Sequence, residues 1–194
     1  MKVLIATGNQ GKIVEIKDIL LELGVEVFTP NDIDLQLDIP ETGKTYQENA
    51  RLKALTYSAA SQMTTLADDT GLEVEALNGL PGLHSARFVD KENATDRDRR
   101  QRLLEMLARK PQPWKARFVC AAILVKPNAD PICTWGECKG EIISEERGEH
   151  GFGYDPIFLL EGTGKTMAEL DLAVKNKISH RAKAVRALEA YLQD

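Results

Sequence analysis

Near its start the chain reads Lys2-Val3-Leu4-Ile5-Ala6-Thr7-Gly8-Asn9-Gln10-Gly11-Lys12, a short apolar run followed by a turn with two glycines. The apolar run is typical of a β-strand. Apolar residues then recur at helical spacing, at Ile13, Ile16, Ile19, Leu20 and Leu23. Gly24 closes this helical pattern, and Val25 to Phe28 predicts a second strand. A strand, a turn, an amphipathic helix and another strand together predict an α/β fold.

The rest of the chain continues this alternation. Further strands are expected at Thr64–Ala67, Glu73–Leu77, Arg117–Lys126, Ile132–Ile143 and Ile157–Leu160, and helices from Thr45 to about Gln62, from about Thr95 to Arg109 and after Ser179. Thr45 with Glu48 forms a capping-box pattern, and Ser179 is the expected N-cap of the last helix. The two long strands around residues 127–131 should pair as a hairpin. The sequence therefore predicts a mixed sheet flanked by helices, in a single domain over residues 1–194 with two lobes and no separable linker.

Composition and charge exclude several classes of function. The chain has 194 residues, of which 43% are hydrophobic, which is enough for a packed core. Its 25 Lys and Arg against 30 Asp and Glu give a net charge of −5 without a basic block, so no nucleic-acid partner is expected. Because the apolar runs are too short for a membrane span and the N-terminus lacks a signal-peptide core, we expect a cytoplasmic protein without a membrane partner. The three cysteines lack a Cys-x-x-Cys pair and are expected to be buried and reduced.

Two adjacent carboxylates, Asp68 and Asp69, stand where the strand ending at Ala67 is expected to give way to a turn at Gly71. Carboxylates at a strand end repel each other, so they need a hard cation such as Mg²⁺, a lysine, or open solvent. Taken alone, the pattern favours a solvated turn. Glu41, in the acidic loop that ends at Gly43, is either a second oxygen ligand for the metal or a solvated acid.

Two glycine-containing loops invite a phosphate-binding interpretation. The loop from Thr7 to Lys12 precedes an expected helix N-terminus, where backbone N–H groups and the helix dipole attract anions, although such turns are also common without a ligand. The stretch Gly162-Thr163-Gly164-Lys165-Thr166 resembles the end of a Walker A loop. Since Leu159 stands where the first Walker glycine should be, we interpret this stretch as a surface turn.

Three further features have an ambiguous role on their own. Phe152 and Tyr154 flank a glycine, and they either stack on a flat base or fill a lobe interface. His180 and Arg181, at a helix start, supply hydrogen-bond donors. Lys53 is either a surface lysine or a phosphate contact.

Taken together, five motifs resemble, in the same order, those of the inosine triphosphate pyrophosphatase family. They are Thr7-Gly8-Asn9-Gln10-Gly11-Lys12, Ala67-Asp68-Asp69-Thr70-Gly71-Leu72, Gly79-Leu80-Pro81-Gly82-Leu83-His84-Ser85-Ala86-Arg87, Gly151-Phe152-Gly153-Tyr154-Asp155-Pro156 and Ser179-His180-Arg181. The resemblance covers nearly the whole chain. It implies an elongated α/β fold with a substrate cleft between two lobes, a homodimer and a requirement for Mg²⁺. It also implies hydrolysis of ITP, dITP and XTP to the monophosphate and pyrophosphate, which keeps deaminated purines out of DNA and RNA.

The resemblance further implies roles for the matching residues. Asp69 is expected to be the proton acceptor and a Mg²⁺ ligand, and Glu41 the other metal-site acid. The residues expected to bind substrate are Lys53, from the pattern above, and, from the resemblance, Thr7, Gly8, Asn9, Gln10, Gly11, Lys12, Thr70, Phe152, Gly153, Tyr154, Asp155, Lys175, His180 and Arg181. The loop from Thr7 to Lys12 would hold the triphosphate, and Phe152 to Asp155 would bind the base.

Two other functions stay open. A pyrophosphatase acting on other modified nucleotides, such as methylated pyrimidine triphosphates, would use the same metal and lysine chemistry. A nucleotide-binding regulator without turnover would need no base at Asp69. A panel of triphosphates with Mg²⁺ separates all three.

Overall fold

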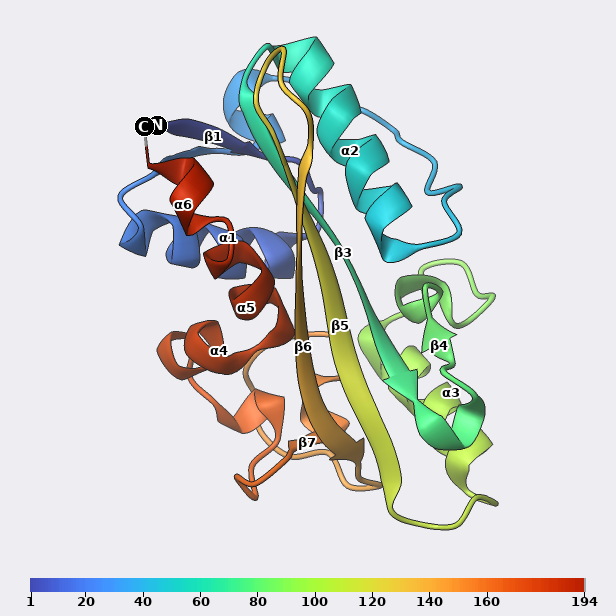
Figure 1. Cartoon of the computed structure of the whole chain (residues 1–194). Helices are drawn as coiled ribbons and strands as arrows, with labels where there is room; N and C mark the ends of the chain where they lie inside the picture. The colour runs from blue at the N-terminus through green and yellow to red at the C-terminus, as the bar shows by residue number, and fades with distance from the viewer. Residues whose placement is uncertain (194) are drawn as a thin grey trace. The chain divides into compact units, whose positions relative to one another are not determined.

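The computed structural model describes residues 1–193, which form two compact units, each assembled from separate stretches of chain (Figure 1). Unit 1 comprises Met1–Asp69, Cys120–Gly136 and the chain from Ser179 onward. Unit 2 comprises Thr70–Val119 and Glu137–Ile178.

Unit 1 is built around the first strand of the chain. β1 (Lys2–Ile5) pairs in parallel with β2 (Glu26–Phe28) on one side and with β3 (Thr64–Val74) on the other. Helix α1 (Gln10–Glu22) makes the crossover that a parallel pair requires. The strand, helix and strand predicted from the opening stretch are confirmed.

Helices cover both faces of the unit 1 part of the sheet (Figure 1). α1 packs beside α5 (His180–Arg186) on one face, near the short α6 (Glu189–Leu192), and α2 (Tyr46–Ser61) covers the other face. Alternate residues of each strand enter different cores because strand side chains alternate between faces. The α1 side holds Val3, Ile5, Ile16 and Leu66, and the α2 side holds Leu4, Ala6, Ala54 and Ala67.

Unit 2 has its own hydrophobic core. It contains α3 (Asp96–Leu107), α4 (Leu172–Ile178), β4 (Pro81–Gly82) and β7 (Phe158–Leu160). β4 pairs antiparallel with β3, and β7 pairs antiparallel with β6 (Ile132–Ile142). The core includes Leu72, Leu103, Leu107, Phe118 and Phe158.

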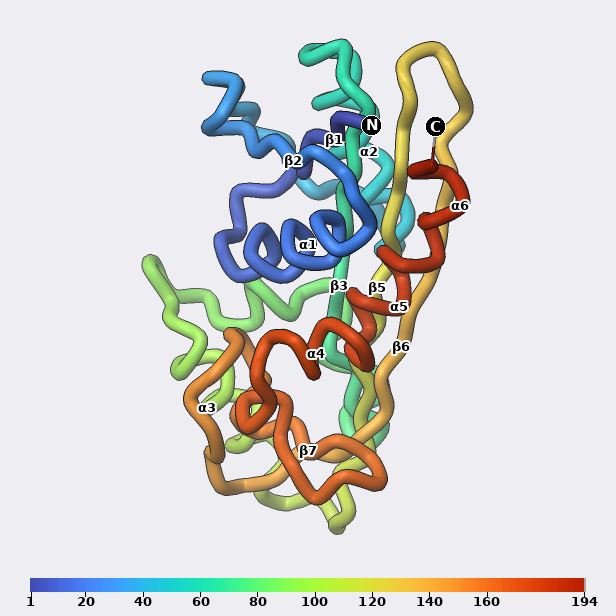
Figure 2. Tube along the Cα trace, turned by 90° about the vertical axis from the view of Figure 1, so that its left-hand side faces the viewer, coloured from blue at the N-terminus to red at the C-terminus, as the bar shows by residue number. Residues whose placement is uncertain are grey.

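Three long strands, β3, β5 (Trp114–Val125) and β6, contribute residues to both units. Over residues 1–193 the strand order is β2-β1-β3-β5-β6-β7, with β4 added on β3. Figure 2 shows β5 and β6 as the predicted hairpin, joined at one end by a short loop. Because parallel and antiparallel pairs both occur, the predicted mixed α/β sheet is confirmed.

β3 differs from the sequence-based expectation. The chain does not turn at Gly71, and the two expected strands around it are one strand that ends at Val74. The segment after Val74 is a short 3-10 helix, Glu75–Leu77. Leu72 and Val74 are buried in the unit 2 core, and this tertiary packing keeps the strand extended through the glycine. The acidic pair therefore lies within a strand rather than at its end.

The helix caps follow the sequence with one difference. The Thr45 hydroxyl accepts from the Glu48 N–H at 3.1 Å, and the Ser179 hydroxyl accepts from the Ala182 N–H at 3.1 Å, both as predicted. In a capping box the Glu48 carboxylate would accept from the N–H of Thr45. Here it accepts from the N–H of the preceding residue, Lys44, at 2.6 Å. Other 3-10 helices are Pro30–Ile33, Ser85–Arg87, Asp155–Ile157 and Met167–Glu169.

Two expectations from composition can be compared with the structure. Cys120 and Cys138 are buried, Cys133 is partly buried, and all three are free thiols. Among residues 1–193 there is no helix with the length and apolar character needed to cross a membrane.

Candidate functional site

The acidic pair lies in the unit 1 part of β3, where strand geometry sends the two side chains to opposite faces of the sheet. Asp68 is 0% exposed and meets residues of α1 and α5. Asp69 is 7% exposed and meets residues of α2. Two neighbouring carboxylates therefore have different partners.

Asp68 is enclosed by positive charge. Lys12 Nζ lies 3.0 Å from Asp68 Oδ1, and Arg181 Nε donates to Asp68 Oδ2 at 3.1 Å. Arg181 also donates to the carboxylate of Glu15, on α1. Burial by itself raises the pKa of Asp68, but the charges of Lys12 and Arg181 outweigh it and hold that pKa well below its usual range. Asp68 is therefore an anion that orients two cations, and it is a poor proton acceptor.

The partners of Asp69 stabilise its ionised form less than Lys12 and Arg181 stabilise that of Asp68. Asn49 and Lys53 lie one turn apart on α2 and so share a face. Asn49 Nδ2 donates to Asp69 Oδ2 at 3.1 Å, and Lys53 Nζ lies 3.6 Å from Asp69 Oδ1. Burial raises the pKa of Asp69 above its ordinary value, and the nearby charge of Lys53 only partly opposes this. A carboxylate with a raised pKa is the better proton acceptor of the pair.

Glu41, the acid predicted to bind the metal together with Asp69, also contacts Lys53. Lys53 Nζ lies 3.0 Å from Glu41 Oε1, so one ammonium contacts both Glu41 and Asp69. This shows that a cation is attracted between the two carboxylates, whose hard oxygen atoms suit Mg²⁺. Among the described residues, His, Cys, Asp and Glu form no group of three that could hold a metal. Two carboxylates nevertheless fit Mg²⁺, because substrate phosphate and water usually complete its shell.

The acidic loop that carries Glu41 is fixed to α2. The Gly43 N–H donates to Asn49 Oδ1 at 2.8 Å, so Asn49 joins this loop to Asp69. Aliphatic side chains at alternate positions of the loop pack on the unit 1 core, namely Ile33, Leu35, Leu37 and Ile39. The loop is therefore a packed segment, although its acidic composition predicted only a polar one.

The loop from Thr7 to Lys12 forms the N-terminus of α1, as predicted. Asn9 is the N-cap, and its side chain accepts from the Lys12 N–H at 3.1 Å. Gly8, Asn9 and Gln10 are exposed, whereas Lys12 is buried next to Asp68. Exposed backbone at a helix N-terminus with a lysine one turn in is a suitable anion site.

A second group of predicted residues comes together in unit 2. Asp155 Oδ2 accepts from the Phe152 N–H at 2.9 Å and from the ammonium of Lys175. That ammonium lies 5.3 Å from the centroid of the Phe152 ring, within cation–π range. The Tyr154 hydroxyl donates to the carbonyl of Ser85 at 2.9 Å, and burial raises the pKa of Tyr154. Aromatic and charged groups of this loop are thus held in a fixed arrangement.

The predicted residues therefore divide between the units. Unit 1 contains Thr7, Gly8, Asn9, Gln10, Gly11, Lys12, Glu41, Lys53, Asp69, His180 and Arg181, and unit 2 contains Thr70, Phe152, Gly153, Tyr154, Asp155 and Lys175. His180 and Arg181, expected to read the base, are both buried in unit 1.

Sequence reasoning did not find Glu15 or the contact of Asn49 with Asp69. Glu15 had a detectable signal, because it lies beside Ile16 on the apolar face of α1, where a charged residue needs a partner. Asn49 had none, since an asparagine on a helix surface is unremarkable by pattern.

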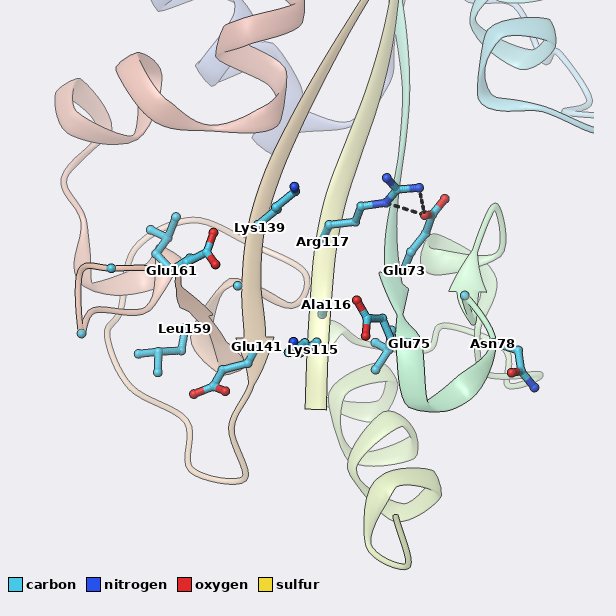
Figure 3. A pocket seen from close by; sticks show the side chains of 16 residues that line it. Glu73, Glu75, Asn78, Lys115, Ala116, Arg117, Lys139, Glu141, Leu159 and Glu161 are labelled. Atoms are coloured by element: carbon cyan, nitrogen blue, oxygen red, sulfur yellow. Dashed lines mark hydrogen bonds and ion pairs between the residues drawn. The ribbon is translucent and has the colours of Figure 1, made fainter. Parts of the chain in front are cut away.

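A separate hollow of about 980 Å³ lies in unit 2 beside β3, β5 and β6 (Figure 3). One of its charged lining residues, Arg117, is paired: its Nη2 lies 2.8 Å from Glu73 Oε2, and its Nη1 lies 3.1 Å from Oε2 of Glu137, which does not line the hollow. The described residues that line it include none of the predicted site residues. This hollow is therefore distinct from the candidate site.

Comparisons with known proteins agree with this picture. The model of the Ham1 family matches residues 3–191. The dITP/XTP pyrophosphatase of Bdellovibrio bacteriovorus is 45% identical over 196 residues, covering 100% of this chain and 98% of that protein. The dITP/XTP pyrophosphatase of Aquifex aeolicus is 46% identical over 201 residues, with the same coverage of 100% and 98%. A solved HAM1 protein from Coxiella burnetii superposes with a TM-score of 0.87 at 38% identity, covering 99% of this chain and 98% of that one.

Proposed function

Because the chain belongs to the Ham1 family, we propose that it hydrolyses non-standard purine nucleoside triphosphates, namely dITP, ITP and XTP, to the monophosphate and pyrophosphate. The observation that carries the proposal is the environment of Asp69, a carboxylate with a raised pKa held beside Lys53, Asn49 and Glu41. A proton acceptor next to cations and a second acid is what phosphoryl transfer to water requires.

The proposed mechanism assigns each unit 1 group a task. Lys12, Lys53 and the backbone from Thr7 to Gly11 bind the triphosphate and offset its charge. Asp69 takes a proton from the water that attacks the α-phosphorus, and the bond from that phosphorus to the bridging oxygen breaks as pyrophosphate leaves. Mg²⁺, held by Glu41 and Asp69, would supply further charge neutralisation when bound.

Base recognition is assigned to the unit 2 loop from Phe152 to Asp155 with Lys175, and to His180 and Arg181. Hypoxanthine and xanthine carry a 6-oxo acceptor, whereas adenine carries an amino donor at that position. Fixed donors in the site therefore disfavour adenine, and sites of this type reject the wrong partner by roughly 10⁴-fold or more.

The test is release of pyrophosphate from a panel of triphosphates with Mg²⁺. We expect XTP, ITP and dITP to be cleaved much faster than ATP, GTP, dTTP or UTP. Asp69→Asn should lose the activity, and Asp38→Asn, which changes an exposed acid in the same unit, should retain it. Faster cleavage of pyrimidine triphosphates would instead support the function on modified pyrimidines, and binding of XTP without turnover would support a regulator.

Three properties of the working enzyme belong to the same proposal. We propose Mg²⁺ as the metal, a homodimer as the assembly, and the cytoplasm, where nucleoside triphosphates are made and used, as the location, with no nucleic-acid or membrane partner. Sedimentation of the purified protein tests the dimer, and replacement of Mg²⁺ by Ca²⁺ or by chelator in the pyrophosphate assay tests the metal.

A further inference from the structure

The backbone N–H and the backbone carbonyl of Gly153, in the loop between Phe152 and Tyr154, are both bonded to side chains of one helix. Its N–H donates to Asp96 Oδ2 at 2.7 Å, and its carbonyl oxygen accepts from Arg100 Nη1 at 2.8 Å. Asp96 and Arg100 are four positions apart in α3 and therefore lie on the same face of that helix. The two side chains thus fix both the donor and the acceptor of this glycine.

Arg100 is itself firmly oriented. Its Nε and Nη2 each donate to one oxygen of Glu146, both at 2.9 Å, and its side chain is only 12% exposed. A guanidinium that forms a two-point pair with a carboxylate has a defined plane, which aims the remaining nitrogen. Glu146 precedes the loop in sequence, so Arg100 joins two points of the same segment to α3.

The backbone conformation of Gly153 is the feature that these two hydrogen bonds from α3 hold in place. Its φ is +62°, in the left-handed region, whereas a Cβ at this position would meet nothing within 4 Å. The glycine is therefore needed for backbone conformation rather than for space. The direction of its two neighbours depends on that conformation, and Phe152 lies over Lys175 while Tyr154 reaches Ser85.

We propose that Asp96 and Arg100 are positioning residues for base recognition, which fix the backbone of Gly153 and thereby the placement of Phe152 and Asp155. This inference rests on the proposed function, because it assigns the loop to the base. The two residues do not act on the phosphates. Their loss should weaken the binding of base-containing molecules while the binding of pyrophosphate stays unchanged.

Arg100→Met tests the proposal, since methionine keeps much of the length and removes every donor. We expect its KM for XTP and its Ki for IMP to rise roughly tenfold, the loss typical of one charge-assisted hydrogen bond, with kcat changed less than about twofold. The Ki for inorganic pyrophosphate should equal that of the parent. Amide hydrogen exchange in the peptide covering residues 151–154 should become faster.

Matched variants separate positioning from a general structural effect. Arg102→Met makes the same change in the same helix, at a side chain that is 54% exposed and lies 3.8 Å from Glu105, and should behave as the parent. Asp96→Asn keeps an acceptor oxygen and should retain near-parental KM, whereas Asp96→Leu should resemble Arg100→Met. An unchanged KM in Arg100→Met, or an equal rise in the constants for XTP and pyrophosphate, overturns the proposal.

The same experiment keeps the two proposals distinguishable. A parent protein that releases no pyrophosphate from any triphosphate overturns the proposed function. Calorimetric binding of IMP to the parent, Arg100→Met and Arg102→Met then decides the positioning role directly. Weaker IMP binding in Arg100→Met alone supports it, and equal or undetectable binding in all three overturns it.

Discussion

Lys12 and Arg181 enclose Asp68 with ion pairs at 3.0 and 3.1 Å, whereas Asp69 has the Lys53 ammonium at 3.6 Å and a neutral amide, Asn49, at 3.1 Å. The pKa of Asp68 is lowered as a result, and burial raises the pKa of Asp69. In the native state the ionised form of Asp69 is therefore held at a cost in folding free energy. Residues that carry out chemistry are commonly destabilising in this way.

The first prediction at this scale concerns Asp69→Asn. Because the folded pKa of Asp69 lies above its ordinary value of 3.8, its contribution to stability is present below that value and is lost as pH rises through the folded pKa. Asp69→Asn should therefore unfold at higher urea concentration than the parent at pH 7, and the difference should shrink as pH approaches 4. Its kcat should fall by about 10² or more, the usual contribution of a general base. A urea midpoint at or below the parental one at pH 7 would contradict the electrostatic account.

The second prediction concerns Arg181, which is 1% exposed and donates to both Glu15 and Asp68. Arg181→Met leaves two carboxylates buried beside it, so we expect a loss of about 3–5 kcal/mol in the free energy of unfolding. Arg186→Met is the matched control in the same helix, because Arg186 is partly exposed and pairs with Glu22 near the surface. The control should lose less than about 1 kcal/mol. Equal losses in urea unfolding of the two variants would show that the buried network is not the cause.

Single residues could be assigned from sequence only where a motif identified them. The preference for Asp69 over Asp68 came from family resemblance, and the opposite faces of a strand now give it a physical basis. Glu15 and Arg181 are 166 positions apart, and no local pattern joins residues so distant. Such partners are created by packing, which a sequence pattern does not contain.

At the scale of elements, local patterns predicted those whose ends carry strong signals. A capping side chain precedes each of the helices α1, α2, α3 and α5. The sequence predicts two of these caps, Thr45 before α2 and Ser179 before α5. The sequence predicts two strands around Gly71 because glycine is common in turns, whereas β3 continues through it as one strand. Glycine weakens a strand, but packing on both sides keeps it extended here, and that packing involves residues far along the chain.

α2 supports a prediction about pH, since it presents both Asn49 and Lys53 to Asp69. Burial raises the pKa of Asp69, and the hydrogen bond from Asn49 partly opposes this rise because it favours the ionised form. Asn49→Ala should raise that pKa further, which moves the acidic limb of the kcat/KM profile to higher pH. Gly43→Ala should act in the same direction, because a Cβ there would lie 2.6 Å from Asn49 Oδ1. Gln47→Ala, an exposed change in the same helix, is the control, and a shift of equal size in this control would contradict the assignment.

At the scale of the whole molecule, the α/β class followed from the alternation of strands and helices, which is a local property. Two lobes were also expected, but the stretches that form each unit could not be predicted, because each unit is assembled from separate parts of the chain and three strands contribute to both. Composition predicted buried thiols correctly for Cys120 and Cys138 but gave no sign that Cys133 is only partly buried.

The stability of the whole protein should fall in acid. Asp68 in unit 1 and Glu146 in unit 2 both have lowered pKa values, because of Lys12 with Arg181 and of Arg100 respectively. A carboxylate with a lowered pKa stabilises the fold when the pH is above its ordinary pKa, which is 3.8 for Asp and 4.5 for Glu. This stabilisation is lost as the pH falls through the pKa of the folded state. The urea midpoint, followed by circular dichroism, should therefore decrease below about pH 4.5, with Asp69 opposing this decrease. A midpoint that is constant from pH 6 to pH 3 would contradict this.

The alternation of side chains along β3 also restricts how this gene can change over evolutionary time. β3 is aligned with β1 from Thr64 to Leu66, and the next residues project to alternate faces. Deleting one codon within this stretch would place Asp69 where Asp68 now meets Lys12, and Thr70 would take the place of the proposed proton acceptor. The hydrophobic composition would hardly alter, yet no carboxylate would remain beside Asn49 and Lys53. Length changes are tolerable in loops, whereas in β3 even a one-residue insertion or deletion before Asp69 would separate the proposed base from its partners Asn49 and Lys53.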